Sequence, residues 1–250
     1  MKEKIEIVEE RIWLIKKLID SKDHFTGREY IKTFERSWDH PYKHYSALRN
    51  YLILTCFDIL GQPAEWLTFD SWLKSKKARK EREEIFSKYH GLDAIEVSIG
   101  VHSDYNKIYG VKNSFYKFLK EILSEANRKR LLDSIKVSHI YQDPVYHEDG
   151  SVTSGLSRPI TVDEEEKYKL LYQIRNVFTH RGESISSGAA GIFENYDDFY
   201  THIPNEPPGY LSQFLMIKVV NGEKWEFNSV GWPHILIDIL KETLEELKKA

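Results

Sequence analysis

The sequence predicts a mainly α protein, a helical bundle with a small β-hairpin insertion near its C-terminal end. Apolar residues recur at intervals of three and four through most of the chain, which is the period of an amphipathic helix. One segment, "FLMIKVVNGEKWEFNSV", instead has two apolar-rich runs on either side of Asn221-Gly222, the preferred pair for a type I′ hairpin turn. We expect a single domain over residues 1–250.

The expected helices follow from these apolar stripes, taken in chain order. The first helix is marked by Ile5, Val8, Ile12, Ile15 and Ile19, and the second by Tyr45, Leu48, Leu52, Cys56 and Ile59. Gly61 should cap the C-terminal end of the second helix. Three further helices are expected in the charged segment 74–90, along the stripe Ile108, Val111, Phe115, Phe118 and Ile122, and in the short segment 127–137.

The second half of the chain mixes irregular and regular segments. Residues 139–160 are rich in Gly, Pro, Ser and Asp and predict a long loop. The next helix should begin at a capping box of Thr161 and Glu164 and end near Gly182. An irregular stretch over 183–212 leads to the hairpin, and the last helix begins near Pro233. Segments 139–160 and 183–230 would thus be elaborations of the bundle.

The composition narrows the classes of function. The 36 basic and 39 acidic residues give a formal charge of −3, so a polyanion partner would need a local basic patch. The single cysteine, Cys56, lies in an apolar run and is expected to be a buried thiol in a reducing compartment. The N-terminal segment does not read as a signal peptide, and no run of about 18 apolar residues predicts a membrane span. We expect a cytoplasmic location.

The stretch "LLYQIRNVFTHRGES", residues 170–184, contains the pattern R-N-x-x-x-H at a helix end. Asn176 and His180 are four residues apart and share a helix face with Tyr172, while Arg175 approaches from the side. The helix dipole favours the imidazolium form of His180, and Arg175 offers a forked cation to a phosphate. General acid-base catalysis and charge stabilisation are what metal-free cleavage of RNA through the 2′-hydroxyl requires. Two copies across a two-fold axis would supply both acid and base.

The segment "IRNVFTHRG" resembles the signature of HEPN domains, all-helical bundles in which an arginine, usually followed by asparagine, precedes a histidine by four to six residues. The explicit match covers about residues 163–182. HEPN domains typically dimerise with paired motifs in a cleft, and many are metal-independent ribonucleases of toxin or antiviral systems. The resemblance implies that Arg175, Asn176 and His180 are catalytic, with RNA as substrate, a homodimer as the active form and no cofactor. An antitoxin or other defence-system protein would be a candidate partner.

Three other residues are candidates for substrate binding. Arg181 follows the motif histidine directly, and it could equally form a salt bridge with Glu183. Tyr172 shares the motif face. Arg49 belongs to a second Arg-Asn pair and would lie near the cleft if its helix packs on the motif helix. His40 and His44 have the spacing of a metal pair but no evident third ligand, so we expect no metal site.

The sequence leaves several alternative interpretations open. Arginine and histidine near a helix C-terminus are also favoured by the dipole without any catalytic role. A non-catalytic module that binds a nucleotide, RNA or a partner protein would use the same cleft. The basic run Lys74, Lys76, Lys77, Arg79, Lys80 and Arg82 is expected to be a solvated, salt-bridged face. Tyr105, Tyr109, Phe115, Tyr116 and Phe118 are expected to pack in the core.

Overall fold

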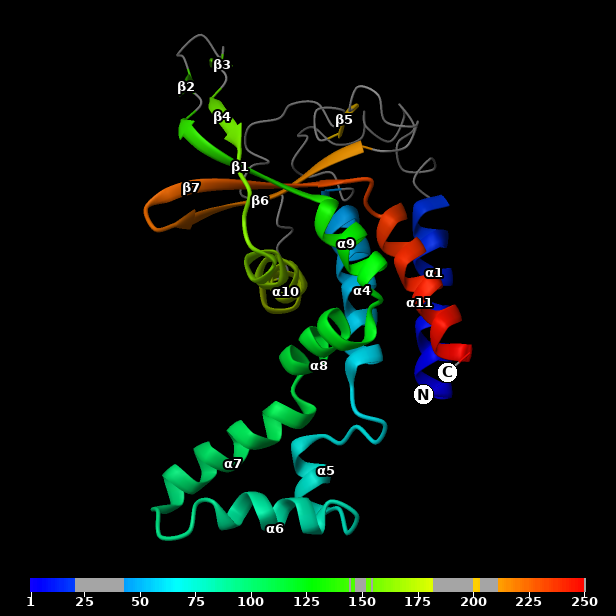
Figure 1. Ribbon diagram of the computed structural model, residues 1–250, viewed down its shortest axis with the longest axis vertical. Coiled ribbons are helices and arrows are strands. Elements are labelled where there is room, and N and C mark those ends of the chain that lie inside the picture. The colour runs from blue at the N-terminus through cyan, green and yellow to red at the C-terminus, as the bar shows by residue number, and fades with distance from the viewer. Residues whose placement is uncertain are drawn as a thin grey trace, which may run out of the picture.

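The structure, a computed structural model, describes residues 1–20, 43–143, 145–146, 152–153, 155–181, 200–202 and 211–249. Within these ranges the fold is mainly helical with a small antiparallel sheet, which confirms the predicted class at that level. Figure 1 shows a sheet at the top, a helical bundle below it and an arm projecting at the bottom. None of the helices in these ranges is both long enough and apolar enough to cross a membrane.

The helical bundle surrounds one central helix. Its elements are α1 (Lys2–Asp20), α4 (Lys43–Gly61), α8 (Val111–Lys117), the π-helical turn η2 (Phe118–Ile122), α9 (Glu125–Asp133), α10 (Glu164–Arg181) and α11 (His234–Lys249). Helix α4 contacts α1, α8, η2, α10 and α11. Ile53, Leu54, Cys56, Phe57 and Leu60 of α4 are fully buried, which confirms the expected burial of the cysteine. A helix enclosed by so many neighbours must be apolar on most of its circumference.

Helices α1 and α4 run antiparallel, and polar contacts fix their register. Lys4 Nζ donates to the main-chain carbonyls of Gln62 and Pro63, just beyond the end of α4. Seven residues along α1, Arg11 Nη1 donates to Thr55 Oγ1. The predicted stripe of α1 is confirmed for Ile5, Val8, Ile12 and Ile15, all of which are buried; the side chain of Ile19 lies outside the described part.

The sheet is larger than the single hairpin that the sequence predicts. Its order is β4-β1-β7-β6-β5, with β1 (Ile135–Gln142), β4 (Leu156–Pro159), β5 (Tyr200–His202), β6 (Leu211–Val220) and β7 (Glu223–Val230). A second sheet pairs β2 (Val145–Tyr146) with β3 (Val152–Thr153). The prediction of a loop over 139–160 is wrong for the described part of that segment, which contains the end of β1 and all of β2, β3 and β4.

The predicted β6–β7 hairpin is confirmed in detail. Asn221 and Gly222 both have positive φ angles, 52° and 86°, as a type I′ turn requires. The irregular stretch predicted over 183–212 overlaps β5 and the start of β6, and residues 182–199 and 203–210 lie outside the described part. The final helix, α11, begins at His234, directly after the predicted Pro233.

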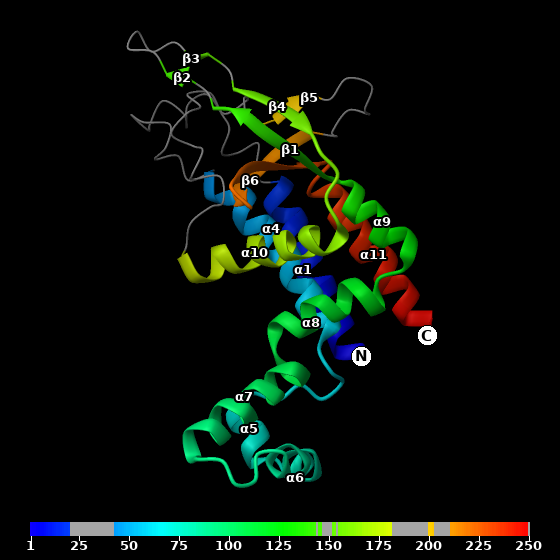
Figure 2. The same ribbon diagram turned by 60° about the vertical axis from the view of Figure 1, so that its left-hand side comes forward.

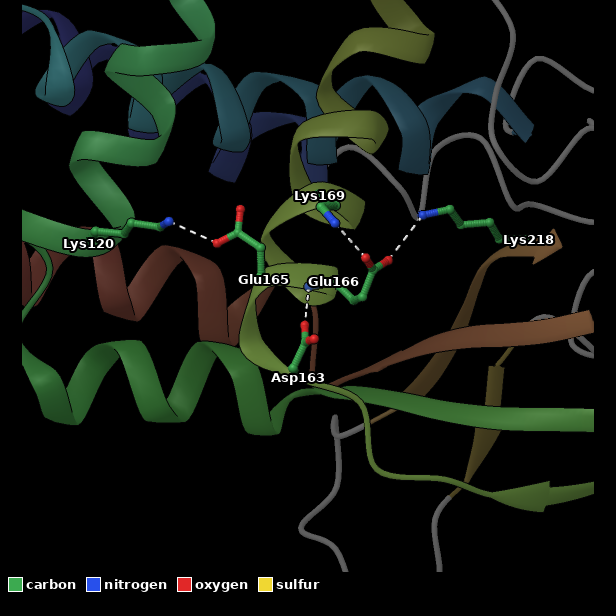
Figure 3. A network of polar contacts seen from close by, with 6 residues as sticks. All are labelled: Lys120, Asp163, Glu165, Glu166, Lys169 and Lys218. Carbon is green, nitrogen blue, oxygen red and sulfur yellow. Dashed lines mark hydrogen bonds and ion pairs between the residues drawn. The ribbon is translucent and has the colours of Figure 1, made fainter. Parts of the chain in front are cut away.

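Helix α10 joins the bundle to the sheet through charged contacts at its first turns (Figure 3). Glu165 accepts from Lys120 of η2 at 2.8 Å, and Glu166 accepts from Lys218 of β6 at 3.3 Å. The capping box at Thr161 is wrong: the helix begins at Glu164, and Asp163 Oδ1 accepts from the Glu166 backbone N–H at 2.7 Å. An acidic N-cap at Asp163 satisfies this donor and also complements the helix dipole.

The arm consists of α5 (Phe69–Lys74), α6 (Arg79–Ser87) and α7 (Ala94–Tyr109) and has a small core of its own. That core contains Trp72, Ala78, Ile85, Val101, Tyr105 and Tyr109. Asp93 caps α7 by accepting from two backbone N–H groups. The sequence predicted one helix through residues 108–122, but the chain divides there at Gly110 into α7 and α8. A Cβ at Gly110 would lie 2.3 Å from the Asn106 carbonyl oxygen.

Gly61 has a different role from the predicted C-cap. It is the last residue of α4, and it is absent from the described residues with positive φ. A Cβ at this position would lie 1.8 Å from the Ser114 carbonyl oxygen of α8. The missing side chain therefore allows the backbones of α4 and α8 to approach closely.

Replacing Gly61 with alanine should destabilise the protein by about 3 kcal/mol, because a main-chain oxygen cannot move aside as a flexible side chain would. Chemical denaturation measures this loss. Lys80→Ala, on the exposed side of α6, is the control and should change stability by less than about 0.5 kcal/mol. Equal stability of the two variants would contradict the close approach of α4 and α8.

Candidate functional site

The motif residues lie on the last turns of α10, which ends at Arg181, next to the predicted end at Gly182. Ile174 is buried against the bundle, and Arg175 and Asn176 are half-buried. His180 lies in the final helical turn, as expected, and the side chains of residues 177–181 are outside the described part. The structure therefore describes the contacts of Arg175 and Asn176 and the backbone position of His180.

Arg175 forms an ion pair with Asp58, a residue that the sequence analysis did not predict as part of the site. Its Nε donates to Asp58 Oδ2 of α4 at 2.8 Å, and its Nη1 donates to Asn176 Oδ1 at 3.1 Å. The side chains of Arg175 and Asp58 are only 14% and 5% exposed. The ion pair is thus largely withdrawn from water and fixes the direction of the guanidinium. Asn176 orients Arg175; the predicted contact of Asn176 with His180 falls outside the described side chains.

The electrostatic state of Asp58 follows from its burial. Burial raises the pKa of Asp58 to about 6, although the charge of Arg175, its hydrogen bond and the charge of Arg11 all act to lower it. Among the described residues, Asp58 Oδ1 has no hydrogen-bond partner, which agrees with a carboxylate that is incompletely solvated. At neutral pH the carboxylate is ionised, but its ionisation is less favourable than in water.

The other predicted binding residues are differently placed. Tyr172 is half-buried and packs against Phe115 and Tyr116 of α8, with ring centroids 5.6 and 6.1 Å away. Arg49 lies on α4, which packs on α10 as expected, and it is only 5% exposed. Arg49 and Asp58 are nine residues apart, about half a turn around a helix, so Arg49 leaves α4 on the side opposite the Asp58–Arg175 pair. The side chain of Arg181 is not described.

Most of the remaining sequence candidates form salt bridges, hydrogen bonds or core contacts. In the basic run, Lys74 pairs with Asp70, Lys77 with Glu65 and Arg79 with Glu83, which supports a solvated, salt-bridged face. Arg82 binds the carbonyls of Trp72 and Ser75. The predicted core aromatics Tyr105, Tyr109, Phe115 and Phe118 are buried, and Tyr116 is half-buried.

Metal-binding groups were sought among the side chains that the structure describes. Those side chains include no cluster of three or more His, Cys, Asp or Glu residues. His40 and the side chain of His44 lie outside that set, so their predicted lack of a metal role stays a prediction. Burial raises the pKa of the Cys56 thiol to about 12, which makes it unreactive as a nucleophile.

Comparisons with known proteins do not assign this site. No family model matches the chain, and no curated protein or solved structure shows significant similarity to it. The function therefore has to be inferred from the site residues and from their contacts in the structure.

Asp58 provides a test of this electrostatic description through the pH dependence of stability. Because its folded pKa of about 6 lies above its ordinary value of 3.8, the folded state binds the proton more tightly, and stability should fall as pH rises from about 4 to about 6. Asp58→Asn should remove this dependence. Urea unfolding of the parent and the variant at several pH values measures this difference, and a parent whose stability does not fall between about pH 4 and 6 contradicts the raised pKa of Asp58.

Proposed function

We propose that this protein is a HEPN-like, metal-independent endoribonuclease that acts as a homodimer in a toxin or antiviral defence system. The observation that supports it most directly is the Asp58–Arg175 ion pair. It fixes an arginine on the same helix as His180 and within two turns of it. Cleavage of a phosphodiester in RNA requires a cation for the phosphate charge and an acid-base group for proton transfer. An arginine and a histidine at one helix end supply these two groups.

In the proposed reaction, His180 of one subunit removes the proton of the 2′-hydroxyl. The 2′-oxygen then forms a bond to phosphorus while the bond from phosphorus to the 5′-oxygen breaks. The protonated His180 of the partner subunit donates a proton to the departing 5′-oxygen, which leaves a 2′,3′-cyclic phosphate. Arg175 stabilises the charge on the equatorial phosphate oxygens. Asp58 and Asn176 orient Arg175 through Nε and Nη1, so both are positioning residues.

Substitution of the motif tests catalysis directly. His180→Ala should lower RNA cleavage by about 10²–10⁴-fold and Arg175→Ala by about 10²–10³-fold, because one removes the acid-base group and the other the phosphate cation. Cleavage of a labelled RNA in excess chelator is the measurement, with a DNA oligonucleotide of the same sequence left intact.

Matched surface residues serve as controls for this experiment. His90 and Arg158 are exposed and remote from the motif in sequence, so His90→Ala and Arg158→Ala should cleave as the parent does. Cleavage by His180→Ala at the parental rate excludes the assignment of the histidine. Inhibition of the parent by chelator excludes the metal-independent mechanism.

A mixing experiment tests whether two subunits share one site. The parent is allowed to exchange subunits with increasing amounts of His180→Ala at constant total protein. If cleavage needs both histidines, the activity should fall as the square of the parental fraction, because only parental dimers are active. A linear fall shows that each subunit acts alone and excludes the composite site.

A non-catalytic module that binds RNA, a nucleotide or a partner protein is the second candidate. It is favoured by the neutralisation of Arg175 by Asp58, together with the formal charge of −3. Both features weaken attraction to a polyanion. Binding of RNA without cleavage, by both the parent and His180→Ala, would identify this module.

A further inference from the structure

Arg49 and Asn50 interrupt the buried surface of α4 with two consecutive polar side chains. They are 5% and 3% exposed, and the next residues on the buried face, Ile53 and Leu54, are apolar. Arginine is almost never buried to this extent unless it is paired. The same dipeptide occurs as Arg175-Asn176 on α10, where the arginine has a carboxylate partner in Asp58.

Arg49 differs from the other arginines with buried or half-buried contacts. Arg11 donates to Thr55, Arg82 to two carbonyls and Arg175 to Asp58. Among the described residues, Nε and Nη2 of Arg49 have no hydrogen-bond partner. A guanidinium stays charged under all ordinary conditions, and a buried donor without a hydrogen-bond partner destabilises the protein, the more so when it is charged. A bound anion would offset this destabilisation.

The two atoms concerned define the chemistry of the ligand. Nε and Nη2 lie on one edge of the guanidinium, and their N–H bonds are parallel. This edge matches two oxygens of a phosphate or carboxylate in a bidentate arrangement. We propose that Arg49 anchors an oxyanion site that takes a phosphate or carboxylate group through this edge.

The position of Arg49 separates this site from the motif. Arg49 is about 13.5 Å along α4 from Asp58 and about half a turn around it. The antiparallel contacts of Lys4 with Gln62 and Arg11 with Thr55 place Arg49 level with the last turns of α1. Figure 2 shows the start of α4 and the end of α10 on the same side of the bundle. The site therefore lies toward the end of the molecule that contains His180, but Arg49 projects from a different face of α4 than Asp58. The proposed anion site does not depend on the proposed ribonuclease activity.

Anion binding by the full chain tests the proposal. Thermal unfolding is followed while phosphate or acetate replaces chloride at constant ionic strength, and the dissociation constant is measured by calorimetry. One of the two anions should raise the unfolding temperature of the parent in a saturable way, and the identity of that anion distinguishes the phosphate from the carboxylate. Absence of a saturable effect with either anion overturns the proposal.

Variants assign the binding to Arg49. Arg49→Met should abolish binding, and Arg49→Lys should weaken it at least tenfold, because lysine keeps the charge but has no bidentate edge. If Arg49→Met does not fold, the lysine variant decides. Arg158→Met, on exposed β4, should bind as the parent does. Unchanged binding in Arg49→Lys, or binding that is lost in Arg175→Lys but kept in Arg49→Met, overturns the assignment.

Discussion

The enclosure of α4 is the constraint on which the rest of the structure depends. Within the described ranges, α1, α8, η2, α10 and α11 contact this helix, so it buries apolar side chains on several faces and defines where these helices pack. A polar group on such a helix must find a partner or remain costly. Asp58 and Thr55 meet arginines from α10 and α1, and these contacts tie the two outer helices to the centre. The polar residues of α4 thus carry more information about function than its apolar ones.

The Asp58–Arg175 pair is not explained by stability. The raised pKa of Asp58 means that burial outweighs the attraction of two arginines, and apolar residues can often replace a buried pair without loss. A pair retained against this cost suits a positioning role, since it holds the guanidinium by Nε and directs its other end. The same pair reduces the charge that Arg175 presents. In a ribonuclease, the pair would orient the Arg175 guanidinium toward the phosphate but weaken its long-range attraction for RNA. RNA binding would then need contacts outside the motif.

The sequence predicts those parts of the fold that local periodicity determines. The stripe of α1, the type I′ turn at Asn221-Gly222 and the start of α11 after Pro233 each depend on neighbouring residues only. Strand β4 was missed because it has only four residues, and β1 because its residues were assigned to the helix expected over 127–137 and the loop expected over 139–160; their pairing joins Ser138 to Pro159. Helix α4 ends at Gly61 as predicted, but the reason for a glycine there was missed, because it is the main-chain carbonyl of Ser114 in α8, more than fifty residues away. Contacts of this range leave no periodic trace in the sequence.

The residues of the candidate site also differ in whether local sequence can predict them. The R-N-x-x-x-H pattern is local and is found by reading one helix, whereas Asp58 is 117 positions from Arg175. A signal for Asp58 was nevertheless present: it is the one acidic residue in "LILTCFDILG", and a carboxylate in a buried run needs a cation. The two Arg-Asn dipeptides look alike in sequence. Packing distinguishes them, because it places a carboxylate against Arg175 and none of the described hydrogen-bond acceptors against the Nε–Nη2 edge of Arg49. Arg175 is therefore held in place from within the protein, whereas the Nε–Nη2 edge of Arg49 is the one that we propose binds an oxyanion.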